Sequence, residues 1–272
     1  MENYSVLMSV YVKEKPEYLQ KSMDSMFSQT VPPDDFVLVC DGPLTQELDS
    51  VINQKKQQYP DTLQIVRLKE NVGLGNALKE GIGHCKNELV ARMDSDDICR
   101  LSRCELQLAE FEKDPKLDII SGTIEEFTES TSKIVGVRTL PCTYREICKF
   151  SQKRNPFNHP ATMFKKKAVI KAGNYSEKYP LFEDYYLWVR MLQNGCQAKN
   201  IKEPLLYMRT SKNMYMRRGG KAYAKDMLRF HTWMRGTGWA SWEDYLTGAV
   251  WHAFVCVLPN MVRKAIYGIL RT

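Results

Sequence analysis

Three carboxylates lie within four positions of the stretch "ARMDSDDICR" (91–100): Asp94, Asp96 and Asp97. Like charges this close repel one another. Two carboxylates spaced Asp-x-Asp on an extended turn can nevertheless bind a divalent cation between themselves and the phosphates of a ligand. We therefore expect Asp94 and Asp96 to be metal ligands. The alternative is structural, with Asp97 as N-cap of a helix over 98–113 and the others as solvated turn residues. We adopt that interpretation for Asp97 only.

The elements that must position these acids alternate between strands and helices. Short apolar runs predict strands over 5–12, 35–42, 63–68 and 88–94. Helical periodicity separates them, starting at Pro16, after Thr45 as N-cap, and near Gly75. This alternation predicts a parallel sheet with helices on both faces. Further along, strands are expected over 117–122, 133–141 and 204–210, a helix over 183–195, and helical, basic sequence from about 213.

Polar residues follow three of the predicted strands where each strand ends. Asp41 ends the second strand, Asn71 and Gly73 follow the third, and Asp94 ends the fourth. Ligands of open parallel sheets bind at the carboxyl ends of the strands, where loops and helix N-termini converge. We expect these four residues to share one rim of the sheet. This convergence supports a ligand site more strongly than any single acid.

The glycine-containing loop "NVGLGNALKEGI" (71–82) could approach a phosphate group. It lacks both the GxGxxG pattern and a Walker lysine, which excludes a Rossmann dinucleotide site and a P-loop. Ligand contact and a purely geometric role in the turn both remain open for this loop.

The chain resembles family 2 glycosyltransferases of the GT-A fold. The blocks that carry the resemblance occur in the family's order and span nearly the whole chain: "SVLMSVY", "VLVCDG", "ENVGLGNALKEGI", "ARMDSDD" with Arg103 downstream, "NHPATMF" and "EDYYLWVR". Bacterial capsular and exopolysaccharide enzymes of the amylovoran-biosynthesis type are especially similar, down to the closing "LPNMVRKAIYGILR". The resemblance implies a GT-A fold: a mostly parallel central sheet flanked by helices, with a helical C-terminal extension.

The resemblance also implies inverting transfer of a sugar from a nucleotide diphosphate sugar, usually a UDP-sugar. Tyr11 and Asp41 would hold the base and ribose, and Asp94 and Asp96 would hold the ribose and a Mn²⁺ or Mg²⁺ ion on the diphosphate. The remaining donor-binding candidates are Asn71, Gly73, Arg103, Arg217 and Arg218. Cys40 departs from the usual Asp-Asp-Gly pattern, so TDP and GDP donors stay possible. Without the resemblance, Tyr11 would be assigned to the core.

Inverting transfer needs a carboxylate that removes the proton of the acceptor hydroxyl. Glu183 and Asp184 begin a strongly periodic helix, and the resemblance assigns the base to Asp184, with Glu183 beside it. The alternative is that both acids only complement the dipole of the helix N-terminus. His159 and Trp188 are expected on the acceptor side, although a lone histidine is more often structural and the periodicity places Trp188 inside.

Composition limits the class of protein. The 272 residues, 43% of them hydrophobic, suffice for one large domain or two closely joined ones. We expect a nucleotide-sugar-binding half (1–100), an acceptor-binding half (101–211) and a basic amphipathic helical region (212–272). The eight cysteines show no CxxC pairs and no framework spacing, which indicates reduced thiols in a cytosolic protein.

The excess positive charge lies in the last quarter of the chain. The net charge is +7, and residues 1–211 carry equal numbers of acidic and basic side chains. A neutral body with a basic tail argues against nucleic acid and for a local partner of the tail. Segment 242–271 mixes aromatic and basic residues and is too short in apolar length to span a bilayer, so we expect it to bind an anionic membrane surface. Packing on the domain, or a homodimer interface, is the alternative.

These inferences predict a cytoplasmic enzyme, peripheral on the membrane, that transfers a sugar to a glycan or lipid-linked acceptor in surface polysaccharide biosynthesis. A sugar-nucleotide pyrophosphorylase would use a similar sheet and Mg²⁺, but no glycine-rich activating loop with a basic residue opens the chain. A non-catalytic binding or scaffold protein would need no base beside the Asp-x-Asp motif.

Overall fold

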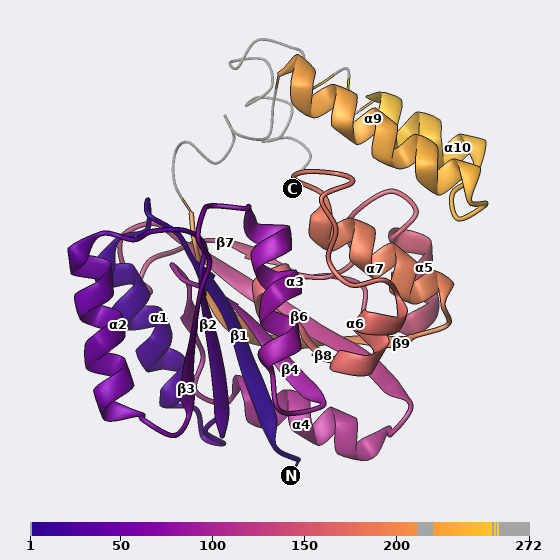
Figure 1. The fold of residues 1–272 in the computed structure, drawn as a ribbon. Helices are drawn as coiled ribbons and strands as arrows, with labels where there is room; N and C mark the ends of the chain where they lie inside the picture. The colour runs from indigo at the N-terminus through magenta and orange to yellow at the C-terminus, as the bar shows by residue number, and fades with distance from the viewer. Residues whose placement is uncertain (1, 211–219, 252, 254, 256–272) are drawn as a thin grey trace.

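The computed structural model describes residues 2–210, 220–251, 253 and 255 (Figure 1). The strands are β1 (Tyr4–Val10), β2 (Asp35–Cys40), β3 (Leu63–Arg67), β4 (Leu89–Asp94), β5 (Ile98–Cys99), β6 (Leu117–Phe127), β7 (Ile134–Arg138), β8 (Met163–Lys165) and β9 (Gln197–Arg209). The helices are α1 (Pro16–Phe27), α2 (Gln46–Gln58), α3 (Leu74–His84), α4 (Arg103–Lys113), α5 (Tyr144–Phe150), α6 (Lys166–Lys171), α7 (Glu183–Gln193), α9 (Lys221–Gly236) and α10 (Trp242–Tyr245). The 3₁₀ turn η1 (His159–Ala161) precedes β8, and the π-helical turn η2 (Leu246–Val250) continues α10.

One sheet runs through the body in the order β3-β2-β1-β4-β8-β6-β9-β5, with β7 paired to β6. The four strands β1 to β4 are parallel, as the alternation of strands and helices predicts. Around β8 the sheet becomes mixed, since β8 is antiparallel to both β4 and β6, while β6 and β9 are parallel. The carboxyl ends of β1, β2, β3 and β4 therefore meet at one edge, as Figure 1 shows.

Helices cover both faces of the sheet because alternate strand residues face opposite sides. Val6 and Met8 of β1 join a core with α1, α2 and α4, whereas Leu7 faces the other core, with α3 and α7. Thr45 caps α2 as expected, since its hydroxyl accepts a hydrogen bond from the backbone N–H of Leu48. Local periodicity and capping thus place the strands that carry the site.

Several predicted boundaries are wrong. The strand expected over 117–122 runs to Phe127, the strand expected over 133–141 ends at Arg138, and two further differences bear on the site. The helix expected over 98–113 begins only at Arg103, and residues 98–99 form the short strand β5 against β9. Asp97 is therefore not its N-cap. The strand expected over 204–210 begins at Gln197, and its pairing with β6 shifts register on both sides of Thr123, the partner of Pro204. Proline and charged residues in β9 mask its period of two.

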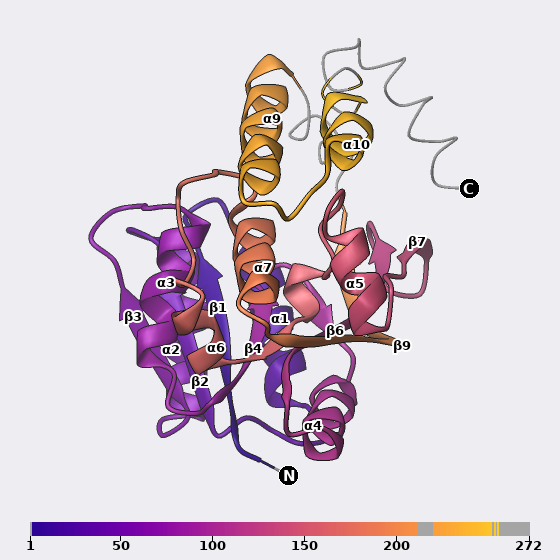
Figure 2. The ribbon, with the colours of Figure 1, turned by 90° about the vertical axis from the view of Figure 1, so that its right-hand side faces the viewer.

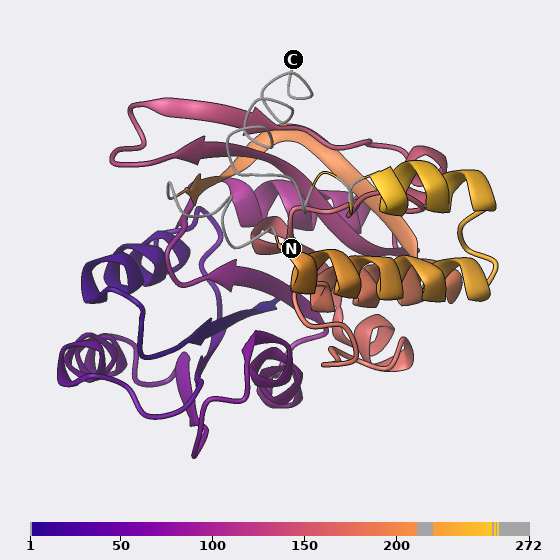
Figure 3. The same cartoon turned by 90° about the horizontal axis from the view of Figure 1, so that it is seen from above.

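The C-terminal helices lie over α7 and α5 (Figures 2 and 3). Phe230 of α9 contacts the ring of Tyr185 on α7, with ring centroids 4.8 Å apart. The indole N–H of Trp239 donates a hydrogen bond of 3.1 Å to Oγ of Ser151, just after α5. No helix within the described residues is long and apolar enough to cross a membrane. Arg263, Lys264 and Arg271, the basic residues of the segment predicted to bind a membrane, lie outside the described part of the chain.

Candidate active site

Asp41 organises the loop that follows β3. Its carboxylate accepts hydrogen bonds from the side-chain amide of Asn71 at 3.0 Å, from the backbone N–H of Val72 at 2.7 Å and from that of Gly73 at 3.1 Å. The loops pack closely here, since a Cβ on Gly42 would lie 2.7 Å from the backbone nitrogen of Asn71. The structure brings Asp41, Asn71 and Gly73 together at the rim. Tyr11, 39% exposed just after β1, lies outside the core.

The acidic turn after β4 gathers its three carboxylates. Oxygens of Asp94, Asp96 and Asp97 lie within 4.8 Å of one another. Burial, and then the charges of Asp94 and Glu14, raise the pKa of Asp96 to about 7. Glu14 follows β1 and accepts a hydrogen bond of 2.6 Å from the hydroxyl of Ser95, so it belongs to the same rim. The turn concentrates negative charge that is partly withdrawn from water.

Asp97 differs from the other two acids because its side chain is buried and hydrogen-bonded within the fold. It is 2% exposed, and its Oδ1 accepts a 2.7 Å hydrogen bond from the backbone N–H of Arg209. Burial, with Asp96 and Asp94 nearby, raises the pKa of Asp97 well above its usual range. Nε of Arg209 donates to the carbonyl of Asp96 at 2.9 Å, and its guanidinium lies over the ring of Tyr18. Asp97 therefore anchors β9 to the turn.

The donor set of this turn fits a hard divalent cation. Carboxylate oxygens are the ligands that Mg²⁺ and Mn²⁺ prefer. Asp94 and Asp96 are half-buried and keep carboxylate oxygens near one another, whereas Asp97 is enclosed. Burial and, after it, repulsion from Asp94 and Glu14 raise the pKa of Asp96, and a bound cation would offset that repulsion. The residues present thus fit the metal expected from the sequence.

A second acidic pair begins α7. Oδ2 of Asp184 accepts a hydrogen bond of 2.7 Å from the side-chain amide of Asn155, and Oδ1 accepts one of 2.7 Å from the backbone N–H of Tyr185. Burial, followed by the charge of Asp184, raises the pKa of the adjacent Glu183 to about 7. A carboxylate held on a rigid helix with a pKa near neutrality is suited to proton transfer.

Arg92 lies between the two acidic pairs. Its Nη2 donates to Oδ1 of Asp94 at 2.5 Å, and its charge opposes the rise in the pKa of Glu183. The side chain is 1% exposed, and its Nε and Nη1 have no hydrogen-bond partner among the described residues. One buried cation is therefore electrostatically coupled to both the acidic turn and the start of α7.

The structure does not bring two of the predicted residues, Arg103 and Trp188, to the surface of the site. Arg103 is fully buried and donates to the carbonyls of Arg92 and Thr162, so it supports the fold rather than reaching a ligand. Trp188 is also fully buried, on the inner face of α7. His159 is half-buried, so its predicted place on the acceptor side stays a prediction. Its Nε2 pairs with the hydroxyl of Tyr175 at 2.9 Å, and desolvation together with Arg92 lowers its pKa well below the usual range. Arg217 and Arg218 lie outside the described residues.

Sequence reasoning missed Arg92, Asn155 and Glu14. Glu14 follows the first strand, so the rule of converging strand ends could have identified it. Arg92 interrupts a buried strand with a charge, which is itself a signal of a paired or functional group. Asn155 lies in irregular sequence and reaches Asp184 only through the tertiary fold.

Comparison with known proteins identifies the family of the chain. The family model "Glycosyl transferase family 2" matches residues 5–173. The UDP-Gal:alpha-D-GlcNAc-diphosphoundecaprenol beta-1,3-galactosyltransferase of Escherichia coli is 37% identical over 97% of this chain and 94% of its own length. The amylovoran biosynthesis glycosyltransferase AmsE of Erwinia amylovora is 37% identical over 84% of each chain.

Solved structures show the same fold at low sequence identity. Staphylococcus aureus TarS 1-349 in complex with UDP-GlcNAc superposes with a TM-score of 0.65 at 16% identity, covering 84% of this chain and 65% of its own. The mannosyltransferase PcManGT from Pyrobaculum calidifontis, in complex with GDP-Man and Mn²⁺, gives 0.64 at 16% identity, covering 84% and 62%. The chain thus spans just under two thirds of each.

Proposed function

Because the chain belongs to glycosyl transferase family 2, we propose that it moves a sugar with inversion from a nucleotide diphosphate sugar to a lipid-linked acceptor in surface polysaccharide biosynthesis. UDP is the expected nucleotide, and an acceptor sugar on a lipid diphosphate is suggested by the E. coli relative. The proposal rests on the position of Arg92, which forms an ion pair with Asp94 of the acidic turn and acts electrostatically on Glu183.

Asp94 and Asp96 would hold Mn²⁺ or Mg²⁺, which when bound offsets the charge that develops on the departing diphosphate. Asp184 takes the proton of the acceptor hydroxyl as the hydroxyl oxygen attacks the anomeric carbon. The bond from that carbon to the diphosphate oxygen breaks, and the nucleoside diphosphate leaves. Asn155 orients the Asp184 carboxylate for this step, since its amide holds Oδ2 at 2.7 Å.

Donor recognition is assigned to the rim formed by Asp41, Asn71 and Gly73, with Tyr11 beside it. In this proposal residues 1–100 hold the donor and residues 101–211 hold the acceptor. Cys40, where the family commonly has an acid, is completely buried, and burial raises the pKa of its thiol to about 11. This departure therefore replaces a carboxylate with an apolar core group, which is compatible with UDP, TDP or GDP donors.

The proposal includes a peripheral position on the cytoplasmic face of the membrane. Four large apolar side chains are exposed on α10, η2 and the next residue: Trp242, Leu246, Val250 and Trp251. Aromatic and apolar side chains beside basic residues favour the membrane interface. A lipid-linked acceptor would be presented at that surface.

The test is a transfer assay with a panel of UDP-, TDP- and GDP-sugars and a lipid-diphosphate-linked acceptor. We expect one or a few UDP-sugars to be consumed, with formation of glycosylated lipid, in the presence of Mn²⁺ or Mg²⁺ and not in EDTA. Adenylyl or uridylyl transfer from a nucleoside triphosphate to a sugar phosphate would instead support a pyrophosphorylase. Nucleotide-sugar binding without turnover on any acceptor would support a non-catalytic binding protein.

A further inference from the structure

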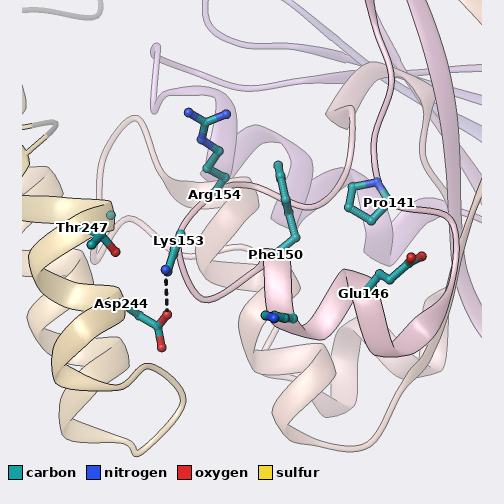
Figure 4. Close-up of a pocket in the computed structure, with 9 residues that line it drawn as sticks. Pro141, Glu146, Phe150, Lys153, Arg154, Asp244 and Thr247 are labelled. Carbon is teal, nitrogen blue, oxygen red and sulfur yellow. Dashed lines mark ion pairs between the residues drawn. The ribbon is translucent and has the colours of Figure 1, made fainter. Parts of the chain in front are cut away.

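A cavity of about 490 Å³ separates α5 from α10 and η2 (Figure 4). Its lining includes Pro141, Lys149, Phe150, Arg154, Thr247 and Gly248. The close-up shows that residues from the body and from the C-terminal helices face one another across it. The cavity is therefore a composite of two segments about a hundred positions apart in the chain.

Its lining combines apolar surface with unneutralised positive charge. Phe150 and Pro141 supply apolar contact area. Lys153 is paired with Asp244 at 3.3 Å, as the dashed line in Figure 4 marks. Lys149 and Arg154 are exposed, and in residues 2–210, 220–251, 253 and 255 no acidic side chain forms an ion pair with either. Such a surface suits an amphiphile with an anionic head.

The second acid that lines the cavity, Glu146, forms no ion pair with Lys149 or Arg154 in the described part of the chain. The carboxylate of Glu146 accepts a hydrogen bond from the backbone N–H of Thr143, and Oγ1 of Thr143 accepts one from the backbone N–H of Glu146; these two bonds form the capping box of α5. The hydroxyl of Thr143 also donates to the Glu146 carboxylate at 2.7 Å. This use of the carboxylate is local to the helix start. Lys149 and Arg154 thus remain the groups with charge to offer a ligand.

The cavity is linked directly to the candidate base. Arg154 precedes Asn155, whose amide donates to Oδ2 of Asp184 at 2.7 Å. The carbonyl of Ser151 accepts a hydrogen bond of 2.7 Å from the hydroxyl of Tyr185, the residue after Asp184. The turn at 151–155 therefore holds the cavity and the start of α7 in one fixed relation.

We propose that this cavity binds the diphosphate and the first apolar units of the polyprenyl carrier of the acceptor. The inference rests on the proposed function, since it names where the carrier lies once the acceptor sugar is at Asp184. Lys149 and Arg154 bind the diphosphate oxygens, and Phe150 with Pro141 contacts the chain. Past Thr247, the chain reaches the exposed apolar residues of α10 and η2, and so the membrane.

Direct binding of farnesyl diphosphate tests this assignment without turnover. The measurement is isothermal titration in EDTA, below the micelle concentration, so that no metal assists binding at the acidic turn. We expect wild-type protein to bind the probe, and the double variant Lys149→Ala/Arg154→Ala to bind it about tenfold or more weakly, because charge-assisted hydrogen bonds are lost. Farnesol and inorganic diphosphate, each lacking one half of the probe, should bind more weakly than farnesyl diphosphate.

Matched controls come from the same region. Arg145 is exposed on α5 but does not line the cavity, and Lys171 is exposed on α6. The double variant Arg145→Ala/Lys171→Ala should retain wild-type affinity. Thr247→Trp, at an exposed position that lines the cavity, should block the probe without removing a charge.

Three results would overturn the inference. The first is equal affinity of the cavity and control variants for farnesyl diphosphate. The second is loss of that affinity in Asp96→Ala, which would place the probe at the donor site. The third is weaker binding of Lys149→Ala/Arg154→Ala to phosphatidylglycerol vesicles with unchanged affinity for farnesyl diphosphate, which would make the cavity a phospholipid contact. In the transfer assay, Lys149→Ala/Arg154→Ala should have a higher KM for the lipid-linked acceptor and an unchanged KM for the donor. This result tests the cavity separately from the proposed function, because the variant still transfers the sugar. Failure of wild-type protein to transfer any sugar would count against the function itself.

Discussion

Nη2 of Arg92 lies 2.5 Å from Oδ1 of Asp94, and this ion pair joins a fully buried cation to a carboxylate that is about one third exposed. The guanidinium is planar and rigid, so it fixes the direction in which Asp94 presents its second oxygen. The same cation acts on Glu183 across the site. Orientation of the acidic turn and the electrostatics of the second acidic pair therefore depend on one side chain.

Arg92→Gln should weaken Mn²⁺-dependent binding of UDP by about tenfold or more, because the charge-assisted hydrogen bond that orients Asp94 is lost. Isothermal titration of UDP in Mn²⁺ measures this. Arg190→Gln is the control, since Arg190, unlike Arg92, donates to backbone carbonyls and lies over the ring of Tyr186, away from the acidic turn. If both variants lose thermal stability but keep UDP affinity, Arg92 serves the fold alone.

Asp96→Ala should abolish the difference between UDP binding in Mn²⁺ and in EDTA. The wild-type protein should be stabilised by UDP much more with Mn²⁺ or Mg²⁺, because the ion would bridge the acidic turn to the diphosphate. Thermal shift with and without UDP measures it. UDP binding that ignores metal, and is the same in Asp96→Ala, would contradict a metal site at this turn.

Asp184→Asn should lower the transfer rate by about 100- to 10,000-fold, the usual cost of losing a positioned general base. The donor affinity should stay near wild type, because the substitution keeps the size of the side chain. Asp61→Asn, at an exposed position, is the control. Retention of more than about a few per cent of the wild-type rate would transfer the role of base to Glu183.

The parts of this site that lie at strand ends could be predicted from the sequence, because parallel strands bring their carboxyl ends together whatever the details of packing. Asp41, Asn71 and Gly73 are joined as that rule requires. The local sequence did not indicate which residues form hydrogen bonds with Asp184 and Asp97. Asn155 reaches Asp184 from irregular sequence, and the backbone of Arg209 satisfies Asp97 across 112 positions.

The misassigned residues have a common physical cause. Arg103 and Trp188 have chemistry that suits ligands, yet each lies on the inner face of its helix, where a large side chain fills the core. Arg103 is tolerated there because backbone carbonyls of β4 and of the segment before β8 accept its hydrogen bonds. The local sequence pattern does not show which buried polar side chains will find hydrogen-bond partners in the tertiary fold.

Glu183→Gln should flatten the dependence of stability on pH. The pKa of Glu183 is about 7 in the folded state, from burial and then Asp184, against about 4.3 in an unfolded chain. Because the folded state holds this proton more tightly, its contribution is fully present below about pH 4.3 and is lost as pH rises through 7. The free energy of unfolding of wild-type protein should therefore fall more between pH 5 and 8 than that of the variant.

Urea unfolding at several pH values measures this difference. Glu17→Gln is the control, since Glu17 is exposed in the first turn of α1. Identical slopes of stability against pH in wild type and Glu183→Gln would show that Glu183 is ionised throughout. In that case the fall in stability would have to be assigned to other buried acids.

The C-terminal region should bind anionic vesicles in a salt-sensitive way. The exposed Trp242, Leu246 and Val250 recur every four residues, which places them on one face of α10 and η2. Each Lys or Arg close to an anionic leaflet adds about 1 kcal/mol, and ten such residues follow position 211. Full-length protein should sediment with phosphatidylglycerol vesicles at low salt, and truncation at Ser241 should leave it in the supernatant.

The apolar face can be tested separately from the charge. Replacing Trp242, Leu246 and Val250 with serine should weaken vesicle binding while preserving its sensitivity to salt, because burial of apolar area and attraction to the leaflet act independently. Lys149→Ala/Arg154→Ala should bind vesicles as wild type does, since its effect is confined to the cavity. Full-length protein that stays in the supernatant at low salt, yet elutes as a dimer that the serine variant cannot form, would assign this face to a second copy of the chain instead of a membrane.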